Sequence, residues 1–197
     1  MDARVLSIQV GMPKVVAIPP ELKSSRRTSK PWVTAICKES VSGPIWLGSQ
    51  GLAGDGQANR KYHGGPERAL LVYAASHYPH WRTELDRPDL AYGAFGENLT
   101  VSGFDESTVR IGQRFAAGEV VFQVASAREP CVALARRFAI PDMVAHVFRT
   151  ARTGWYCRVL REGYLEAGQA LRLIPQGEGE GAVAELGSTV AAELRSR

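Results

Sequence analysis

The chain has 197 residues, 45% apolar and 22% charged, a composition typical of one globular domain and unlike that of disordered or collagen-like proteins. No apolar run approaches the roughly 18 residues of a membrane-spanning helix, and the N-terminus lacks the features of a secretory signal, so we expect a cytoplasmic protein. The net charge of +4 is concentrated in residues 11–40. It favours an anionic ligand there, although a solvated basic face would look the same.

Short segments rich in β-branched and aromatic residues predict strands, because Gly, Pro, Asp or Ser bounds each of them. We expect strands at residues 4–10, 32–38, 43–48, 69–74, 97–101, 108–111, 119–125, 154–160 and 170–174. Helical patterns occupy residues 76–85, 132–138 and 141–150, and residues 12–31 are expected to form a long loop. The pattern predicts a mostly β fold with short helices, built as a barrel or a sandwich.

A change in composition at residue 176, where a Gly- and Glu-rich stretch begins, divides the chain into two parts. We expect a domain over residues 1–175 and a C-terminal tail over residues 176–197.

The three cysteines form no C-x-x-C pair, so reduced thiols are expected. Alternation places Cys37 and Cys157 on the apolar faces of their predicted strands, which favours small core residues. The histidines of an H-x-x-H motif, His77 and His80, flank a proline and have no carboxylate neighbour in the motif. We therefore interpret them as surface residues and not as metal ligands.

Cys131 differs because it directly precedes the predicted helix 132–138. Free N–H groups at a helix N-terminus stabilise a thiolate, and Arg128 and Arg136 would add to this effect while Glu129 opposes it. The position suits an inert helix cap or a reactive or metal-ligating cysteine, and we favour the second interpretation.

Two glycine-rich segments accompany Cys131. Residues 48–65 contain six glycines and the cationic and titratable group Arg60, Lys61 and His63. They predict a phosphate or oxyanion site, or simply turns between strands. No Walker A or G-x-G-x-x-G motif is present. In residues 93–101, Glu97 and Asn98 lie where a glycine turn leads into a predicted strand. There they would project into a barrel mouth or act as ordinary hydrogen-bonding residues.

Four motifs occur together and in order: GLAGDGQANRKYHGGPERA at 51–69, GAFGENL at 93–99, REPC at 128–131 and GWY at 154–156. This set closely resembles the MOSC domain family, and most strongly its YiiM-like, 6-N-hydroxylaminopurine resistance branch. The resemblance covers about residues 5–174. It implies a mostly β, barrel-like fold related to the pyruvate-kinase β-barrel, whose mouth binds the molybdenum cofactor.

The resemblance implies that Cys131 ligates molybdenum, and a soft thiolate suits a sulfur-rich metal centre. The implied activity is reduction of N-hydroxylated compounds to amines, with electrons from an external reductase. We expect His63 to donate a proton or orient the substrate, since imidazole titrates near neutral pH. Asn98 would hydrogen-bond the pterin or the substrate, and Glu97 is a weaker candidate.

The cofactor's phosphate needs cations, and guanidinium groups suit it because they bind phosphate through paired hydrogen bonds. The candidate cofactor-binding residues are Arg27, Lys30, Arg60, Lys61, Gly64, Gly65 and Arg128. The chain departs from the family in two ways. Ala133 stands where members commonly have lysine, and the tail is too short for the C-terminal three-helix domain of many YiiM-like proteins. Both departures leave cation placement and docking of the electron donor open.

Two other functions compete with the reductase. Cys131 would also suit a sulfur carrier or transferase that bears a persulfide destined for the cofactor. A non-enzymatic binder of anions or nucleic acid is the weakest alternative, because no aromatic-interleaved or zinc-finger pattern accompanies the charge.

Overall fold

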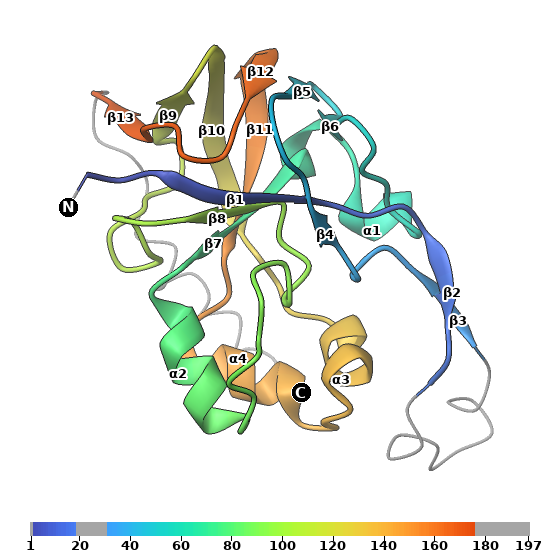
Figure 1. The fold of residues 1–197 in the computed structure, drawn as a ribbon. Helices are drawn as coiled ribbons and strands as arrows, with labels where there is room; N and C mark the ends of the chain where they lie inside the picture. Colours follow the sequence, from blue (N-terminus) through green and yellow to red (C-terminus); the bar gives the residue numbers. More distant parts are fainter. Residues whose placement is uncertain (1, 19–30, 176–197) are drawn as a thin grey trace.

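The computed structural model describes residues 2–18 and 31–175. Its main sheet has eight strands in the order β13-β9-β10-β11-β7-β8-β1-β4 (Figure 1). The strands are β1 (Val5–Val10), β4 (Glu39–Ser40), β7 (Leu70–Ala74), β8 (Leu99–Val101), β9 (Arg114–Ala117), β10 (Val120–Ala127), β11 (Trp155–Arg161) and β13 (Arg172–Ile174). All neighbours run antiparallel except β7 and β8, which are parallel. The link between β7 and β8 is therefore a crossover, and it carries a helix.

Two small sheets complete the strands. One contains β12 (Gly163–Leu165), β5 (Ile45–Gly48) and β6 (Gly51–Leu52), and the other pairs β2 (Lys14–Val16) with β3 (Trp32–Thr34). The predicted mostly β fold with short helices is confirmed. The end strands β13 and β4 of the main sheet do not pair with each other in the described part of the chain, so no continuous ladder closes this sheet into a barrel. A single antiparallel bridge, Arg4 with Ala170, links the residue before β1 to the chain before β13.

The main core lies on the sheet and follows the alternation of its strands. In β10, Val120, Phe122 and Val124 are buried while the residues between them are only partly covered. Strand β7 is buried at every position because it pairs with β11 and β8 and both its faces are covered. Cys157 of β11 belongs to this core and is fully buried, as predicted.

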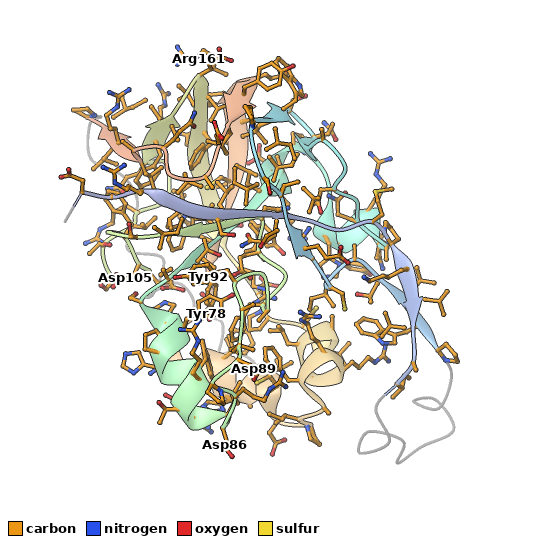
Figure 2. The ribbon with its side chains drawn as sticks, viewed as in Figure 1. Tyr78, Asp86, Asp89, Tyr92, Asp105 and Arg161 are labelled. Atoms are coloured by element: carbon orange, nitrogen blue, oxygen red, sulfur yellow. The ribbon has the colours of Figure 1, made fainter. Side chains whose placement is uncertain are left out.

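Three helices gather at one end of the sheet, at the bottom of Figure 1: α2 (His77–Glu84), α3 (Val132–Phe138) and α4 (Met143–Thr150). They enclose a second, largely aromatic core. Figure 2 shows Tyr78 and Tyr92 inside this region and Asp86 and Asp89 at its outer end. The rings of Tyr78 and Tyr92 meet edge to face at 4.8 Å. No helix of residues 2–18 and 31–175 has the length and apolar character needed to cross a membrane.

Two of the predicted strands differ from the structure. Residues 108–111 form a turn instead, because the carboxylate of Asp105 accepts hydrogen bonds from the backbone N–H groups of Ser107 and Thr108. The predicted strand 32–38 ends at Thr34, whose hydroxyl accepts a hydrogen bond from the N–H of Ile36 and bends the chain.

The end of β3 at Thr34 changes the place of Cys37, which we predicted to be a core residue. Cys37 lies after the strand, is only partly buried and belongs to neither core. Its Sγ accepts a hydrogen bond of 2.9 Å from the guanidinium of Arg137. The core prediction for Cys37 is therefore wrong, because strand alternation does not continue through the bend.

Other boundaries shift less. The predicted loop 12–31 contains strand β2, and the helix predicted for residues 141–150 begins at Met143.

The H-x-x-H histidines differ from each other: His80 is exposed, whereas His77 is half-buried and its Nε2 lies 2.5 Å from Glu106 Oε2. The surface interpretation is thus wrong for His77, whose carboxylate partner comes from a distant turn. No cluster of three candidate metal-ligating side chains occurs in the described residues. The predicted tail 176–197 lies outside them.

Candidate functional site

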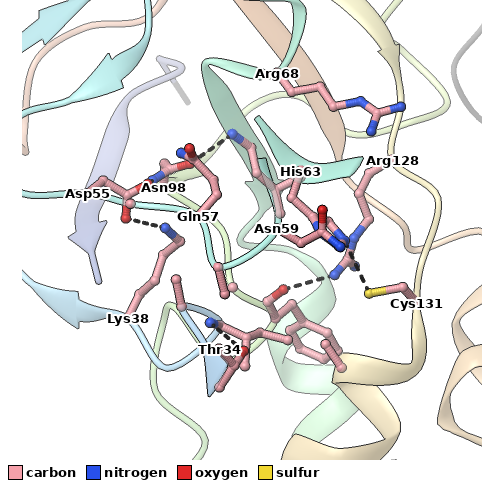
Figure 3. Close-up of a pocket in the computed structure, with 18 of the residues that line it drawn as sticks. Thr34, Lys38, Asp55, Gln57, Asn59, His63, Arg68, Asn98, Arg128 and Cys131 are labelled. Atoms are coloured by element: carbon pink, nitrogen blue, oxygen red, sulfur yellow. Dashed lines mark hydrogen bonds and ion pairs between the residues drawn. The ribbon is translucent and has the colours of Figure 1, made fainter. Parts of the chain in front are cut away.

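A pocket of about 290 Å³ opens beside the start of α3, and β3 forms part of its wall. Its lining comes from within residues 32–38, 55–68, 95–98 and 128–136, together with Leu71 and Tyr156. Figure 3 shows this pocket with its polar side chains. Four chain segments that are far apart in sequence therefore meet here, and each of the four motifs singled out in the sequence contributes to the lining.

Cys131 lies in the pocket as the residue that caps the N-terminus of α3. Its backbone is extended while the helix begins at the next residue, so the thiol is placed at the helix end. The Sγ atom lies 3.5 Å from Nε2 of His63 (Figure 3). Because the thiol is only partly buried and lines a cavity, a ligand can reach it.

The surroundings of Cys131 favour its thiolate. Burial raises the pKa of the Cys131 thiol, but the His63 hydrogen bond, the backbone N–H of Ala133 and the charge of Arg128 outweigh burial and lower the pKa below its usual value. At position 133 the contribution comes from the backbone, so alanine in place of lysine does not remove it. The thiol therefore has the properties of a nucleophile or of a soft metal ligand.

His63 reaches the pocket from the one-turn helix α1 (Arg60–His63), which sequence reasoning did not predict. The carbonyl of Asn59 accepts hydrogen bonds from the N–H groups of Tyr62 and His63, which closes the turn. Gly65 follows with a φ of 92°, a conformation that favours glycine. The glycines of this loop thus position the imidazole.

Arg128 is a buried cation in the wall of the pocket. Its guanidinium donates to the carbonyls of Phe95 (3.1 Å) and Thr153 (3.4 Å). Within the described residues no carboxylate pairs with it. A buried charge without a counter-ion is costly, so the Arg128 side of the pocket favours an anionic ligand.

Two further arginines line the pocket: Arg136, which we expected to act on Cys131, and Arg68, which sequence reasoning missed. The guanidinium of Arg68 lies 5.5 Å from the ring centre of Tyr156, and that of Arg136 lies 5.1 Å from the ring centre of Trp32. Neither pairs with a carboxylate of the described residues. Arg68 belongs to the quoted motif at 51–69, so its position in that motif was the available signal.

The Asn98 side chain lines the pocket and also connects three parts of the fold. Its Oδ1 accepts a hydrogen bond from the N–H of Leu71 (3.1 Å), and its Nδ2 donates to the carbonyl of Gln9 (3.3 Å) and to Asp55 Oδ2 (2.8 Å). These bonds use both amide hydrogens. Asn98 therefore shapes the pocket, and its Oδ1 retains one lone pair for a ligand.

Glu97 lies outside the pocket lining and is fully buried. Its carboxylate accepts hydrogen bonds from the hydroxyls of Tyr78 and Thr100 and from the N–H groups of Gly93 and Phe95. This set of donors closes the glycine turn before β8, a structural role. Gly96 in the same turn has a φ of 80°, and a Cβ there would lie 2.8 Å from Cγ1 of Ile36.

The predicted site residues thus separate into three groups. Cys131, His63, Arg128 and Asn98 meet in the pocket, whereas Arg60 and Lys61 lie exposed on α1, outside the lining. Gly64 and Gly65 follow α1, are partly buried and also lie outside the lining. Arg27 and Lys30 lie outside the described residues. In the described part of the lining, Arg68 and Arg136 supply the cationic character that we predicted for Arg60 and Lys61.

Comparisons with known proteins agree with these motifs. The MOSC domain family matches residues 59–172. An uncharacterized protein YflK of Bacillus subtilis is 42% identical over 174 residues, 88% of this chain and 74% of that protein. Protein YiiM of Escherichia coli is 40% identical over 143 residues, 72% of this chain and 64% of that protein. A protein named Reductase from Gibberella moniliformis is 38% identical over 144 residues, and the match covers 26% of its length.

Solved structures agree as well. YiiM from Geobacillus stearothermophilus superposes with a TM-score of 0.76 at 31% identity, covering 97% of this chain and 85% of that one. YiiM from Escherichia coli gives a TM-score of 0.68 at 32% identity, with 79% of this chain and 74% of that chain covered. MOSC domains as a family are associated with the molybdenum cofactor. The chain belongs to the MOSC domain family and, within it, to the YiiM-like branch.

Proposed function

We propose that this protein binds the molybdenum cofactor in the pocket and reduces N-hydroxylated compounds, such as hydroxylaminopurine-type bases, to amines. One observation carries the proposal: a partly exposed thiol whose pKa is lowered, 3.5 Å from an imidazole, lines a cavity that also contains a buried arginine with no carboxylate partner in the described residues. The family association with this cofactor supports it.

The donor set of the pocket fits a metal–pterin group that carries a phosphate. Cys131 would ligate the metal, because a thiolate is a soft ligand. Arg128 and Arg68 would hold the phosphate, since planar guanidinium groups bind phosphate oxygens in pairs and neither has an acidic partner in the described residues. Asn98 would meet the pterin edge with the remaining lone pair of its Oδ1.

Reduction of an N–OH group to N–H consumes two electrons and two protons and releases one water. The bound cofactor would supply the two-electron redox chemistry, with electrons from an external reductase. The protein has to orient the N–OH group and move protons. His63 would move these protons, a role supported by its place in the pocket lining with Nε2 3.5 Å from Cys131 Sγ.

The first test is metal content. The protein is purified from cells that make the cofactor, and molybdenum is measured beside Cys131→Ala and Cys37→Ala. We expect about one molybdenum per chain for wild type and for Cys37→Ala, whose thiol lies outside the pocket lining. Cys131→Ala should lose at least about tenfold, because a metal–thiolate bond is lost. Equal metal in Cys131→Ala and wild type would refute the ligand assignment.

The second test is activity. The loaded protein is supplied with a reductase as electron donor and with 6-N-hydroxylaminopurine, and formation of the amine is followed. We expect His63→Asn to lower kcat by about 100-fold, the contribution typical of a general acid, with the molybdenum content retained. Metal-loaded wild-type protein that produces no amine from any N-hydroxylated base would exclude the reductase function.

A persulfide carrier is the second candidate, because the lowered pKa of Cys131 and its access to the pocket also suit sulfur transfer. Intact mass after incubation with a cysteine desulfurase and cysteine distinguishes it. A carrier gains one sulfur atom at Cys131, whereas the reductase remains at its unmodified mass.

A further inference from the structure

A buried ion pair in the same pocket has no role in the proposed function. Lys38 follows the bend after β3, and Asp55 lies in the glycine loop after β6; their side chains form an ion pair. Both side chains are almost completely covered, with 8% and 3% exposed, yet both line the pocket. Figure 3 shows this pair on the side of the pocket opposite Cys131.

Asp55 is held in place from three directions. Besides Lys38, its Oδ1 accepts a hydrogen bond from the N–H of Gly11 (2.8 Å), and its Oδ2 accepts one from Asn98 Nδ2 (2.8 Å). The carboxylate is thereby tied to the chain after β1 and to the start of β8. A carboxylate fixed in this way also fixes the ammonium group that it pairs with.

The Lys38 ammonium has donor capacity left over. A lysine ammonium carries three N–H donors, and in the described part of the chain Asp55 accepts the only hydrogen bond that Nζ makes. Burial lowers the pKa of Lys38, while the charges of Asp55 and Glu97 raise it. Buried donors without acceptors are costly, so a group entering this end of the pocket gains by supplying an acceptor atom.

The charge balance indicates what kind of acceptor fits. Lys38 and Asp55 neutralise each other, so this end of the pocket adds little long-range attraction for anions, unlike Arg128 on the other side. An oriented, neutral ion pair recognises its ligand at hydrogen-bonding distance. An occupant that presents an acceptor oxygen here, from a ring carbonyl or from a phosphate, therefore gains a hydrogen bond.

We propose that Lys38 is a ligand-positioning residue that donates a hydrogen bond to an acceptor oxygen of the molecule in the pocket, with Asp55 holding the ammonium in place. This role rests on one part of the proposed function, namely that the pocket binds the ligand. It assigns to the pocket a second recognition point, remote from Cys131, that fixes the orientation of the bound molecule.

The test uses the full chain purified without cofactor and two probes measured by calorimetry. The probe 6-hydroxymethylpterin offers a ring carbonyl and no phosphate, and phenyl phosphate offers a phosphate and no ring carbonyl. We expect Lys38→Met to weaken one probe at least about tenfold, which corresponds to about 1.4 kcal/mol. The probe that responds identifies the source of the acceptor oxygen.

Lys14→Met is the matched control, because Lys14 also pairs with a carboxylate, that of Glu39, but at the surface with 49% and 82% of the side chains exposed. It should leave both affinities within about twofold. Lys38→Met leaves Asp55 buried without its partner, so the double variant Lys38→Met with Asp55→Asn keeps the pocket wall neutral and guards against misfolding. Lys38→Arg keeps the charge and should restore part of the affinity.

Two results would overturn the proposal: wild-type protein that binds neither probe, or Lys38 variants that bind both probes as wild type does. These results are separate from a failure of the proposed function, which appears as missing molybdenum or missing amine formation in the wild-type protein whatever the Lys38 variants do.

Discussion

Cys131 and Cys157 are two thiols of one chain in opposite surroundings. Cys157 lies in the middle of the main sheet among aliphatic and aromatic neighbours, where burial raises the pKa of its thiol. Cys131 is also substantially covered, but the imidazole and the guanidinium beside it lower its pKa. Burial alone therefore does not decide thiol chemistry; the polar groups that a cavity brings to the sulfur decide it.

Alkylation is expected to show the largest difference between these two regions. Iodoacetamide should modify Cys131 in the folded protein at least about 1,000-fold faster than Cys157, because Cys157 becomes accessible only when the sheet opens. Peptide mapping by mass spectrometry measures both rates, and modification in denaturant provides the fully accessible reference. Comparable rates at the two cysteines would remove the contrast between core and pocket.

The pH dependence of stability tests the surroundings of Cys157 in the core. In the unfolded chain Cys157 ionises above pH of about 8.5, whereas its raised pKa keeps it protonated in the fold. The unfolded state then binds fewer protons, so the free energy of unfolding falls as pH rises, by up to about 1.4 kcal/mol per pH unit. At pH 10 the loss relative to pH 7 reaches about 2 kcal/mol. Urea unfolding of wild type and Cys157→Ala measures it.

Cys157→Ala has its own cost at neutral pH, so the slope with pH is the quantity to compare. The variant should show a flatter decline over this range. Burial also raises the pKa of Tyr73, Tyr78 and Tyr156, but these tyrosines are common to wild type and Cys157→Ala, so their contribution cancels in the comparison. A slope unchanged by Cys157→Ala would mean that the thiol ionises in the folded protein.

His63→Asn tests the pocket side with the smallest expected effect. Removing the imidazole removes the hydrogen bond that lowers the pKa of Cys131, so the pKa should rise and less thiolate should exist at pH 7. The alkylation rate at pH 7 should fall about tenfold, because a hydrogen bond to a charged group contributes about 1.5 kcal/mol and about 1.4 kcal/mol corresponds to a factor of ten. Tyr62→Asn, at an exposed neighbour on α1, serves as the control and should react as wild type does. An unchanged rate in His63→Asn would place the cause in Arg128 or in the backbone.

The sequence predicted the fold class because alternation and glycine punctuation are local signals. It identified Cys131 for a similar reason, since a helix start is visible within a few residues. It failed at Cys37, because a hydrogen bond to the Thr34 hydroxyl ends the strand and alternation does not register such a bend. Lys38 was missed because its partner Asp55 is 17 residues away and its burial is a property of the assembled pocket.

The cationic residues of the pocket were also predicted only in part, because sequence adjacency does not show which side chains reach it. Arg60 and Lys61 stand next to His63 in sequence, yet a one-turn helix directs His63 toward the pocket and leaves its neighbours in solvent. Arg68 reaches the lining from beyond the glycines. Residues that are adjacent in sequence therefore need not reach the same site, because the local backbone decides where each side chain points.

Because the pocket is lined by segments between residues 32 and 156, it exists only when most of the chain has folded. Any molecule that occupies it binds the native state and not the unfolded one. Its binding therefore raises the melting temperature in proportion to the logarithm of its concentration. A thermal-shift screen of small heterocycles and phosphates thus reports on the whole domain through this one cavity.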